Sequence, residues 1–343
     1  MTACRVSLVC AAALIAVAGA QVPAVEDGFT VVVLPDTQCY TSGGAPEHPG
    51  SCGARPAGAP QMLQAGAEWI ARNADRLRIA AVLSLGDTTE CGNAESEWQR
   101  AEASFRILDG RGLPYLVAVG NHDYDAWCTA GGLSSRALAA FNRHFGTARY
   151  ATHPWYGAST YPAGSGENAF ITFDAGTSKF LAITLELFPR RAALEWAGRV
   201  LDANADRQAI VVTHAYLSAE GSRHETVTNP GPSAYRMTDA ADGEGIWTAL
   251  ASQHPNVIAV VSGHAGGSTG AGAVASRVDA GAHGNLVPQM LSNYQFDAGG
   301  GSGYLRLMHV QPSTQTIAVR TYSPYLDRWQ TDSRNDFTVR YSH

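Results

Sequence analysis

The chain has 343 residues, of which 45% are hydrophobic and 16% are charged. This composition excludes a disordered, collagen-like or coiled-coil chain and is sufficient for a large buried core. The 24 lysines and arginines against 30 aspartates and glutamates give a net charge of −6, which argues against nucleic acid as a general partner.

The amino-terminal segment has the pattern of a secretory signal peptide. Arg5 precedes an apolar run over Val6–Val17, and Ala18-Gly19-Ala20 forms a small-residue cleavage pattern. We expect cleavage after Ala20, so that residues 1–20 are the signal peptide and residues 21–343 form a single secreted or periplasmic domain. The alternative is a membrane anchor, but the run is short for a span and no cationic stop-transfer cluster follows it. No later stretch predicts a membrane span in the mature chain.

The cysteines that remain after cleavage are expected to form disulfides, because an even number in an exported chain favours them. These are Cys39, Cys52, Cys91 and Cys128. Of the possible pairings we favour Cys39 with Cys52, which bracket one Gly/Pro-rich loop, and therefore Cys91 with Cys128. The alternative, a cysteine-ligated zinc site, lacks any C-x-x-C spacing.

The predicted elements alternate between strands and helices and then become mostly strands. Predicted strands cover Thr30–Leu34, Ile79–Leu85, Tyr115–Val119, Phe170–Phe173, Phe180–Thr184, Ala209–Thr213, Val257–Ser262, Ala273–Asp279, Leu286–Leu291, Tyr304–Val310, Thr316–Tyr322 and Phe337–Tyr341. Predicted helices cover Gln61–Asn73, Ala94–Leu108, Ser134–Phe145, Arg191–Asn204 and Gly245–Gln253. A long polar loop covers Ser218–Asp239, and its His224 is expected to be solvated. With no internal repeat and no linker, the pattern favours one α/β domain.

Five of the apolar strands end in polar clusters. The clusters are Asp36-Thr37-Gln38, Gly86-Asp87, Gly120-Asn121-His122-Asp123, His214 and Gly263-His264. Each alone could be a helix cap, a turn or a structural histidine. Because ligands bind beyond the carboxyl ends of strands in α/β sheets, we expect the five to converge. Carboxylate, amide and imidazole groups together suit a divalent metal ion.

This ordered set of motifs resembles the calcineurin-like metallophosphoesterase superfamily, over about residues 29–325. The D-T-Q of the first motif and the later Ser292-Asn293-Tyr294-Gln295 resemble a secreted bacterial branch of it. The resemblance implies a four-layer α/β/β/α sandwich with two mixed β-sheets. It also implies a dinuclear metal centre, with two divalent ions (Mn, Zn or Fe) as cofactors.

The resemblance also implies a role for each motif. Asp87 would bridge both ions, and Asp36 and Gln38 would bind the first ion. The second ion would be bound by Asn121, His214 and His264.

His122 would contact the phosphate and protonate the leaving group, while a metal-bridging hydroxide attacks phosphorus. Its orienting carboxylate would be Glu90 or Asp123, and we favour Glu90. The resemblance therefore implies a secreted, metal-dependent phosphoric ester hydrolase acting on monoesters or diesters.

Two departures concern the first ion. Gln38 stands where the superfamily commonly has histidine, and Gly266 stands where it commonly has a second histidine ligand. We expect the first ion to bind more weakly than the second, or to be an oxygen-preferring ion such as manganese.

Substrate contacts are predicted for Arg190, Tyr216 and Asn293. The alternative for Arg190 is an ion pair that caps the following helix. The expected substrate is a small phosphate ester, and the expected state is a monomer. A catalytically degenerate phosphoesterase fold acting as an extracytoplasmic binding protein is the alternative function. A carbohydrate-binding module, suggested by aromatic residues such as Trp155, does not explain the ordered metal-ligand set.

Overall fold

The computed structural model describes residues 27–42, 52, 59–130, 133, 135–224, 231–267 and 272–343. The predicted signal peptide lies outside these residues. Within them, one sheet contains β1 (Phe29–Leu34), β2 (Ile79–Ser84), β3 (Tyr115–Val117), β10 (Leu305–Gln311), β11 (Thr316–Ser323), β12 (Arg328–Gln330) and β13 (Asp336–Arg340). The other sheet contains β4 (Phe170–Ala175), β5 (Ser178–Leu185), β6 (Gln208–Thr213), β7 (Val257–Ser262), β8 (Ala273–Ala280) and β9 (Leu286–Asn293). The helical segments are α1 (Gln38–Thr41), α2 (Ala59–Asn73), α3 (Glu95–Arg111), α4 (Trp127–Ala130), α5 (Ala139–Phe145), α6 (Thr147–Tyr150), α7 (Arg191–Ala203), α8 (Gly243–Ile246), the π-helix η1 (Trp247–Ala251) and α9 (Ala298–Gly301).

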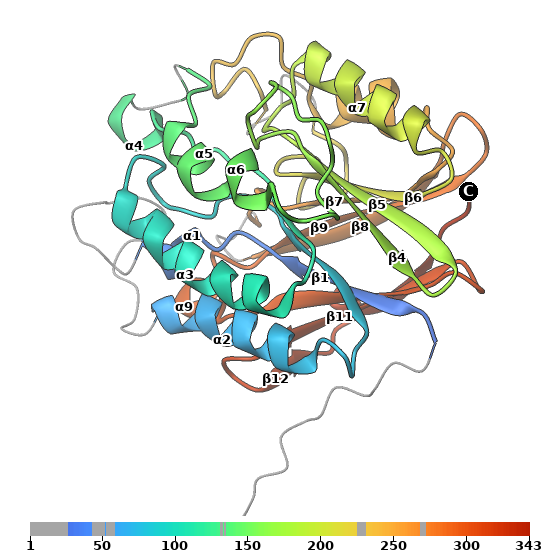
Figure 1. Ribbon diagram of the computed structural model, residues 1–343, viewed down its shortest axis with the longest axis horizontal. Helices are drawn as coiled ribbons and strands as arrows, with labels where there is room; N and C mark the ends of the chain where they lie inside the picture. Colours follow the sequence, from blue (N-terminus) through green and yellow to red (C-terminus); the bar gives the residue numbers. More distant parts are fainter. Residues whose placement is uncertain are drawn as a thin grey trace, which may run out of the picture.

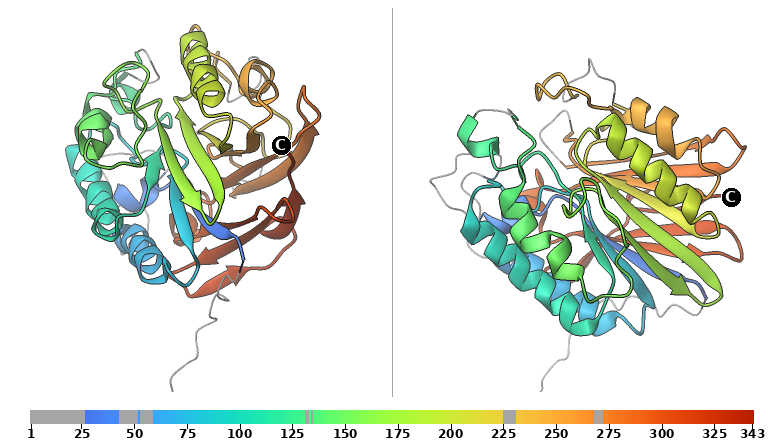
Figure 2. Two further views of the ribbon diagram at one scale, coloured as in Figure 1. Left: turned by 45° about the vertical axis from the view of Figure 1, so that its right-hand side comes forward. Right: turned by 45° about the horizontal axis from the view of Figure 1, so that its top comes forward.

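The two sheets stack face to face, with helices on both outer sides (Figures 1 and 2). Alternation along β1 shows why: Val31 and Val33 belong to the core between the sheets, whereas Val32 and Leu34 belong to the core beneath α2 and α3. A third core lies between the second sheet and α7 with η1. Buried on both faces, β1 is apolar at every position after Thr30. The predicted four-layer α/β/β/α sandwich is confirmed.

Both sheets are mixed. The first has the order β12-β11-β10-β1-β2-β3, with β13 also paired to β11, and the second has the order β4-β5-β6-β7-β9-β8. Strands β1, β2 and β3 run parallel, as do β5, β6, β7 and β9. Parallel neighbours bring their carboxyl ends to one edge, so the loops after these strands lie together.

One predicted helix is shorter than its sequence pattern indicates. Helix α5 begins at Ala139 instead of Ser134, because the Asp125 carboxylate accepts hydrogen bonds from the backbone N–H groups of Ala139 (2.8 Å) and Ala140 (3.2 Å). The start of α5 is thus capped by a residue from the loop between β3 and α4. Arg136, just before it, donates to the carbonyl oxygens of Leu187 and Phe188 instead of joining the helix.

Candidate metal centre

The five polar clusters meet at the edge where the parallel strands of both sheets end. His214 follows β6, and its Nδ1 lies 2.8 Å from the carbonyl oxygen of Leu85, next to β2. A carbonyl oxygen only accepts, so Nδ1 carries the proton and Nε2 is left to act as a ligand.

Three side chains surround Nε2 of His214. It lies 3.3 Å from Asp87 Oδ2, 3.2 Å from Asn121 Oδ1 and 3.1 Å from His264 Nδ1. Asp87, His214 and His264 also form a buried group whose ligand atoms all lie within 4.8 Å of one another. Atoms bound to one ion at about 2.1 Å lie about 3.0 to 3.4 Å apart at octahedral or tetrahedral angles. The arrangement therefore fits one divalent ion.

A second set of oxygen atoms lies on the β1 side of Asp87. The Nε2 of Gln38 is 3.1 Å from Asp87 Oδ2, and Asp36 Oδ1 accepts the backbone N–H of His264 at 3.0 Å. Oδ2 of Asp36 and Oε1 of Gln38 are buried without a hydrogen-bond partner among the described residues. Buried oxygens without partners are costly, and a bound cation would satisfy both.

His122 lies beside the cluster. Its Nδ1 donates to the carbonyl oxygen of Glu90 at 2.8 Å, and the Glu90 carboxylate is 3.5 Å from the same nitrogen. Its Nε2 is therefore directed the other way, 4.0 Å from Asp87 Oδ2. The half-buried ring of Trp127 lies 4.7 Å from the His122 ring.

Comparison of the sequence with known protein families identifies the family of this chain. The sequence profile described as calcineurin-like phosphoesterase matches residues 29–266, more than half of the chain. The chain belongs to the calcineurin-like phosphoesterase family. The predicted resemblance is confirmed at that level. Members of the family hydrolyse phosphoric esters with divalent metal ions.

Known proteins are similar to this chain in sequence or in fold. "Uncharacterized protein YvnB" of Bacillus subtilis is 29% identical over 306 residues, which are 89% of this chain and 21% of the relative, so the chain spans about a fifth of its length. A dimetal phosphatase of Danio rerio superposes with a TM-score of 0.54 at 14% identity, covering 92% of this chain and all of that one. The purple acid phosphatase PPD1 of yellow lupin gives 0.53 at 14% identity, covering 93% of this chain and 55% of its own.

Backbone constraints hold the candidate metal ligands in place. Asp36, Asp87 and His264 have positive φ angles of 39°, 49° and 72°, a conformation that non-glycine residues rarely adopt. The motif glycines permit close approach: a Cβ at Gly120 would overlap the Asp87 carboxylate, and one at Gly263 would overlap that of Asp36. Glycine is thus required at these two positions because any side chain would displace a neighbouring carboxylate.

The buried charges strongly perturb one another. Burial, reinforced by the charge of Asp87, raises the pKa of Asp36 to about 8. Burial also acts to raise the pKa of Asp87, but His214 and His122 outweigh it and hold that pKa well below its usual range. Burial acts to lower the pKa of His214, yet Asp87 raises it to about 9. Metal ions bind deprotonated ligands, so binding would displace protons from this cluster.

Asp123 and Glu90, the two candidates to orient His122, occupy different surroundings. Oδ1 of Asp123 accepts from the backbone N–H groups of Thr88 (2.9 Å) and Thr89 (3.0 Å), and Oδ2 accepts from that of Gly120 (2.9 Å). Asp123 thus ties the loop after β2 to the loop after β3. Of these two residues, Glu90 is the one that contacts His122 Nδ1, through both its carbonyl oxygen and its carboxylate.

The three residues predicted to contact substrate make hydrogen bonds or ion pairs within the protein. Arg190 forms a two-point ion pair with Glu186, at 2.8 and 2.9 Å, which matches the alternative interpretation of a pair at the start of α7. Tyr216 is fully buried in the core under the second sheet, with its hydroxyl donating to Gln289. The amide of Asn293 donates to the carbonyl oxygen of His264 at 3.0 Å. Each of these side chains thus has a partner within the protein, and their contact with substrate stays a prediction.

Several residues of the site carry no sequence signal. Glu97 of α3 accepts the backbone N–H groups of Glu90 (2.7 Å) and Cys91 (3.1 Å). Tyr235 places its hydroxyl 3.2 Å from Nε2 of His264. His224 is 3% exposed, and its ring lies 6.3 Å from that of His264, so the expectation of a solvated histidine is wrong.

Both predicted disulfides are present. Cys39 pairs with Cys52 and Cys91 with Cys128, with Cα–Cα distances of 5.1 and 5.5 Å. A second group with ligand spacing, formed by Cys39, Cys52 and Glu90, is therefore no free metal site. No helix among the described residues has the length and apolar character needed to cross a membrane.

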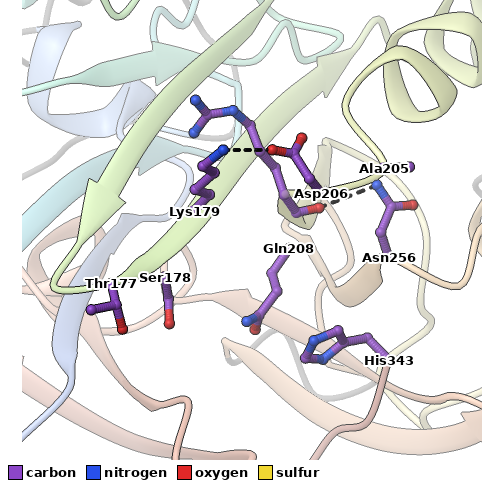
Figure 3. Close-up of a pocket in the computed structure, with 9 residues that line it drawn as sticks. Thr177, Ser178, Lys179, Ala205, Asp206, Gln208, Asn256 and His343 are labelled. Atoms are coloured by element: carbon purple, nitrogen blue, oxygen red, sulfur yellow. Dashed lines mark hydrogen bonds and ion pairs between the residues drawn. The ribbon is translucent and has the colours of Figure 1, made fainter.

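A separate cavity of about 300 Å³ lies at the opposite end of β5 and β6 (Figure 3). Its polar groups pair with one another: Lys179 with Asp206 at 2.7 Å, and the Asn256 side chain with the carbonyl oxygen of Arg207 at 3.2 Å. The opposite strand ends hold the metal-ligand set, so this cavity is not part of the candidate centre.

Proposed function

We propose that this protein is an extracytoplasmic phosphoric ester hydrolase that binds two divalent ions. The observation that supports this most is the converging set of Asp87, Asn121, His214 and His264, next to the unpartnered oxygens of Asp36 and Gln38. Oδ2 of Asp87 lies 3.1 Å from Gln38 Nε2 and 3.3 Å from His214 Nε2, a position between the two sets that suits a bridging ligand. The two disulfides are compatible with a location outside the cytoplasm.

The bound ions would supply positive charge for the phosphoryl oxygens and would lower the pKa of water. His122 supplies the proton. Because the Glu90 carbonyl oxygen accepts the Nδ1–H, the second nitrogen, Nε2, faces the cluster. In the doubly protonated ring, Nε2 can give its proton to the departing oxygen, which leaves the neutral ring with its proton on Nδ1. Two backbone N–H groups of the Glu90 loop are fixed in turn by Glu97, which keeps that carbonyl oxygen in place.

The surroundings of His122 suggest how a leaving group is received. The Trp127 ring lies 4.7 Å from His122 and 5.9 Å from the Tyr235 ring. Tyr235 in turn lies 5.7 Å from Phe188. This aromatic series follows the His122 side of the centre, where the leaving group must depart if His122 is the acid.

The decisive experiment compares hydrolysis of p-nitrophenyl phosphate and bis-p-nitrophenyl phosphate with Mn²⁺, with Zn²⁺ and with EDTA. We expect metal-dependent turnover that falls by about 100- to 10,000-fold in His122→Ala, the contribution typical of general acid catalysis, with the metal content unchanged. His283→Ala, which alters an exposed histidine far from the motifs, is the control. Metal binding by a folded protein that hydrolyses neither ester would instead favour the degenerate binding protein.

A further inference from the structure

The first metal site lacks a ligand at Gly266, and a side chain at this position would require the Phe296 ring to move. A Cβ on Gly266 would lie 2.6 Å from the ring of Phe296. The half-buried Phe296 belongs to the segment after β9, and its ring therefore packs beside Gly266 in the loop after β7. The position where the ligand is missing thus lies next to residues 293–296.

That same segment brings a polar side chain to the first metal site. The backbone N–H of Gln295 donates to Asn293 Oδ1 at 2.9 Å, and the Asn293 amide donates to the carbonyl oxygen of His264 at 3.0 Å. These two bonds fix the segment against the ligand loop after β7. The Gln295 side chain is 4% exposed, and its Oε1 contacts the Nε2 of Gln38.

We infer that the side-chain oxygen of Gln295 is a ligand of the first metal ion. Gln38 Nε2 contacts both Gln295 Oε1 and Asp87 Oδ2, while Gln38 Oε1 has no partner among the described residues. Turning the Gln38 amide by half a revolution, a choice that the hydrogen-bond network decides, would place its oxygen beside those two oxygens. A cation would then join the three.

This assignment defines the chemistry of the first site. Asp36, Gln38, Asp87 and Gln295 offer two carboxylates and two amides, and no imidazole. Oxygen ligands favour hard ions such as Mn²⁺ or Mg²⁺, whereas the second site, with two histidines, suits Zn²⁺ or Fe²⁺. The inference rests on the proposed dinuclear centre and replaces the missing ligand at Gly266 with one from the segment after β9.

The test is calorimetric titration of the metal-free protein with Mn²⁺ alone, together with metal analysis. We expect wild-type protein to bind two ions, and Gln295→Ala to bind one of them at least about tenfold less tightly while the affinity for the other is unchanged. Gln295→Glu should restore or exceed wild-type affinity, because a carboxylate can occupy the same position. Gln289→Ala, which removes a buried amide from β9 where it contacts Tyr216, should leave both constants unchanged.

A double variant separates a ligand from a residue that merely orients Gln38. In the Gln38→Ala background, Gln295→Ala should still weaken the first ion if Gln295 binds it directly. No further loss in that background would overturn the inference, as would wild-type constants in Gln295→Ala or fewer than two ions in the wild type. Two bound ions without ester hydrolysis would contradict the proposed function alone, because the metal constants would still test Gln295.

Discussion

The Cys91–Cys128 disulfide lies beside His122 and should stabilise the protein more than the Cys39–Cys52 disulfide does. Cys91 directly follows Glu90, and Cys128 directly follows Trp127, so the bond joins the two segments that contact the His122 ring. Replacing both cysteines by serine removes this connection. The other disulfide, Cys39–Cys52, closes a shorter loop and serves as the matched control.

The expected magnitude follows from loop closure in the unfolded chain. A separation of 37 residues for Cys91–Cys128 corresponds to about 3.8 kcal/mol at 25 °C, from the entropy of closing a loop of that length. A separation of 13 residues for Cys39–Cys52 corresponds to about 2.9 kcal/mol. The free energy of unfolding should therefore fall by more in the Cys91→Ser/Cys128→Ser variant.

The assay is urea unfolding at pH 7 in EDTA, so that metal binding does not add to the stability of the folded state. We expect both serine pairs to lower the midpoint, with the larger loss for the longer loop. A smaller loss for Cys91→Ser/Cys128→Ser than for the control pair would refute the loop-closure reasoning. With metal restored, this variant should also lose more ester hydrolysis than the control, because the His122 surroundings are released.

Three further outcomes are expected. Glu97→Ala leaves two buried backbone N–H groups unpaired and should cost about 1–3 kcal/mol for each in urea unfolding; an unchanged midpoint would contradict this. Tyr235→Phe should weaken binding of the second ion about tenfold in Mn²⁺ titration, because His264 loses the hydroxyl that orients its ring; an unchanged dissociation constant would contradict this. Burial acts to raise the pKa of Asp279, but Arg277 and other donors outweigh it and lower the pKa to about 2. Asp279→Asn should therefore destabilise the protein above about pH 4, with the difference shrinking as pH falls toward 2; a constant difference would exclude this ionic contribution.

The sequence was sufficient for features that depend on local pattern. Continuous apolar runs such as Val31–Leu34 predict strands buried on both faces, and β1 covers this run. A polar motif follows each of these runs in the sequence. Because the carboxyl ends of parallel strands lie at one edge of a sheet, the sequence also predicts that the motifs converge. The disulfide pairing followed from one local loop and elimination, and the structure has the same pairs.

Contacts between distant segments were beyond the sequence. Gln38 and Gln295 are 257 residues apart, and no periodicity relates a loop after β1 to a loop after β9. Arg190 could equally have faced a phosphate, and only the position of Glu186 decided otherwise. The strands and their terminal motifs are thus determined by the order of apolar and polar residues along the chain. The contact between Gln38 and Gln295 is decided by how the two sheets stack, since these residues follow strands of different sheets. The cap of α5 and the partners of His122 are decided by which loops lie side by side after β2 and β3.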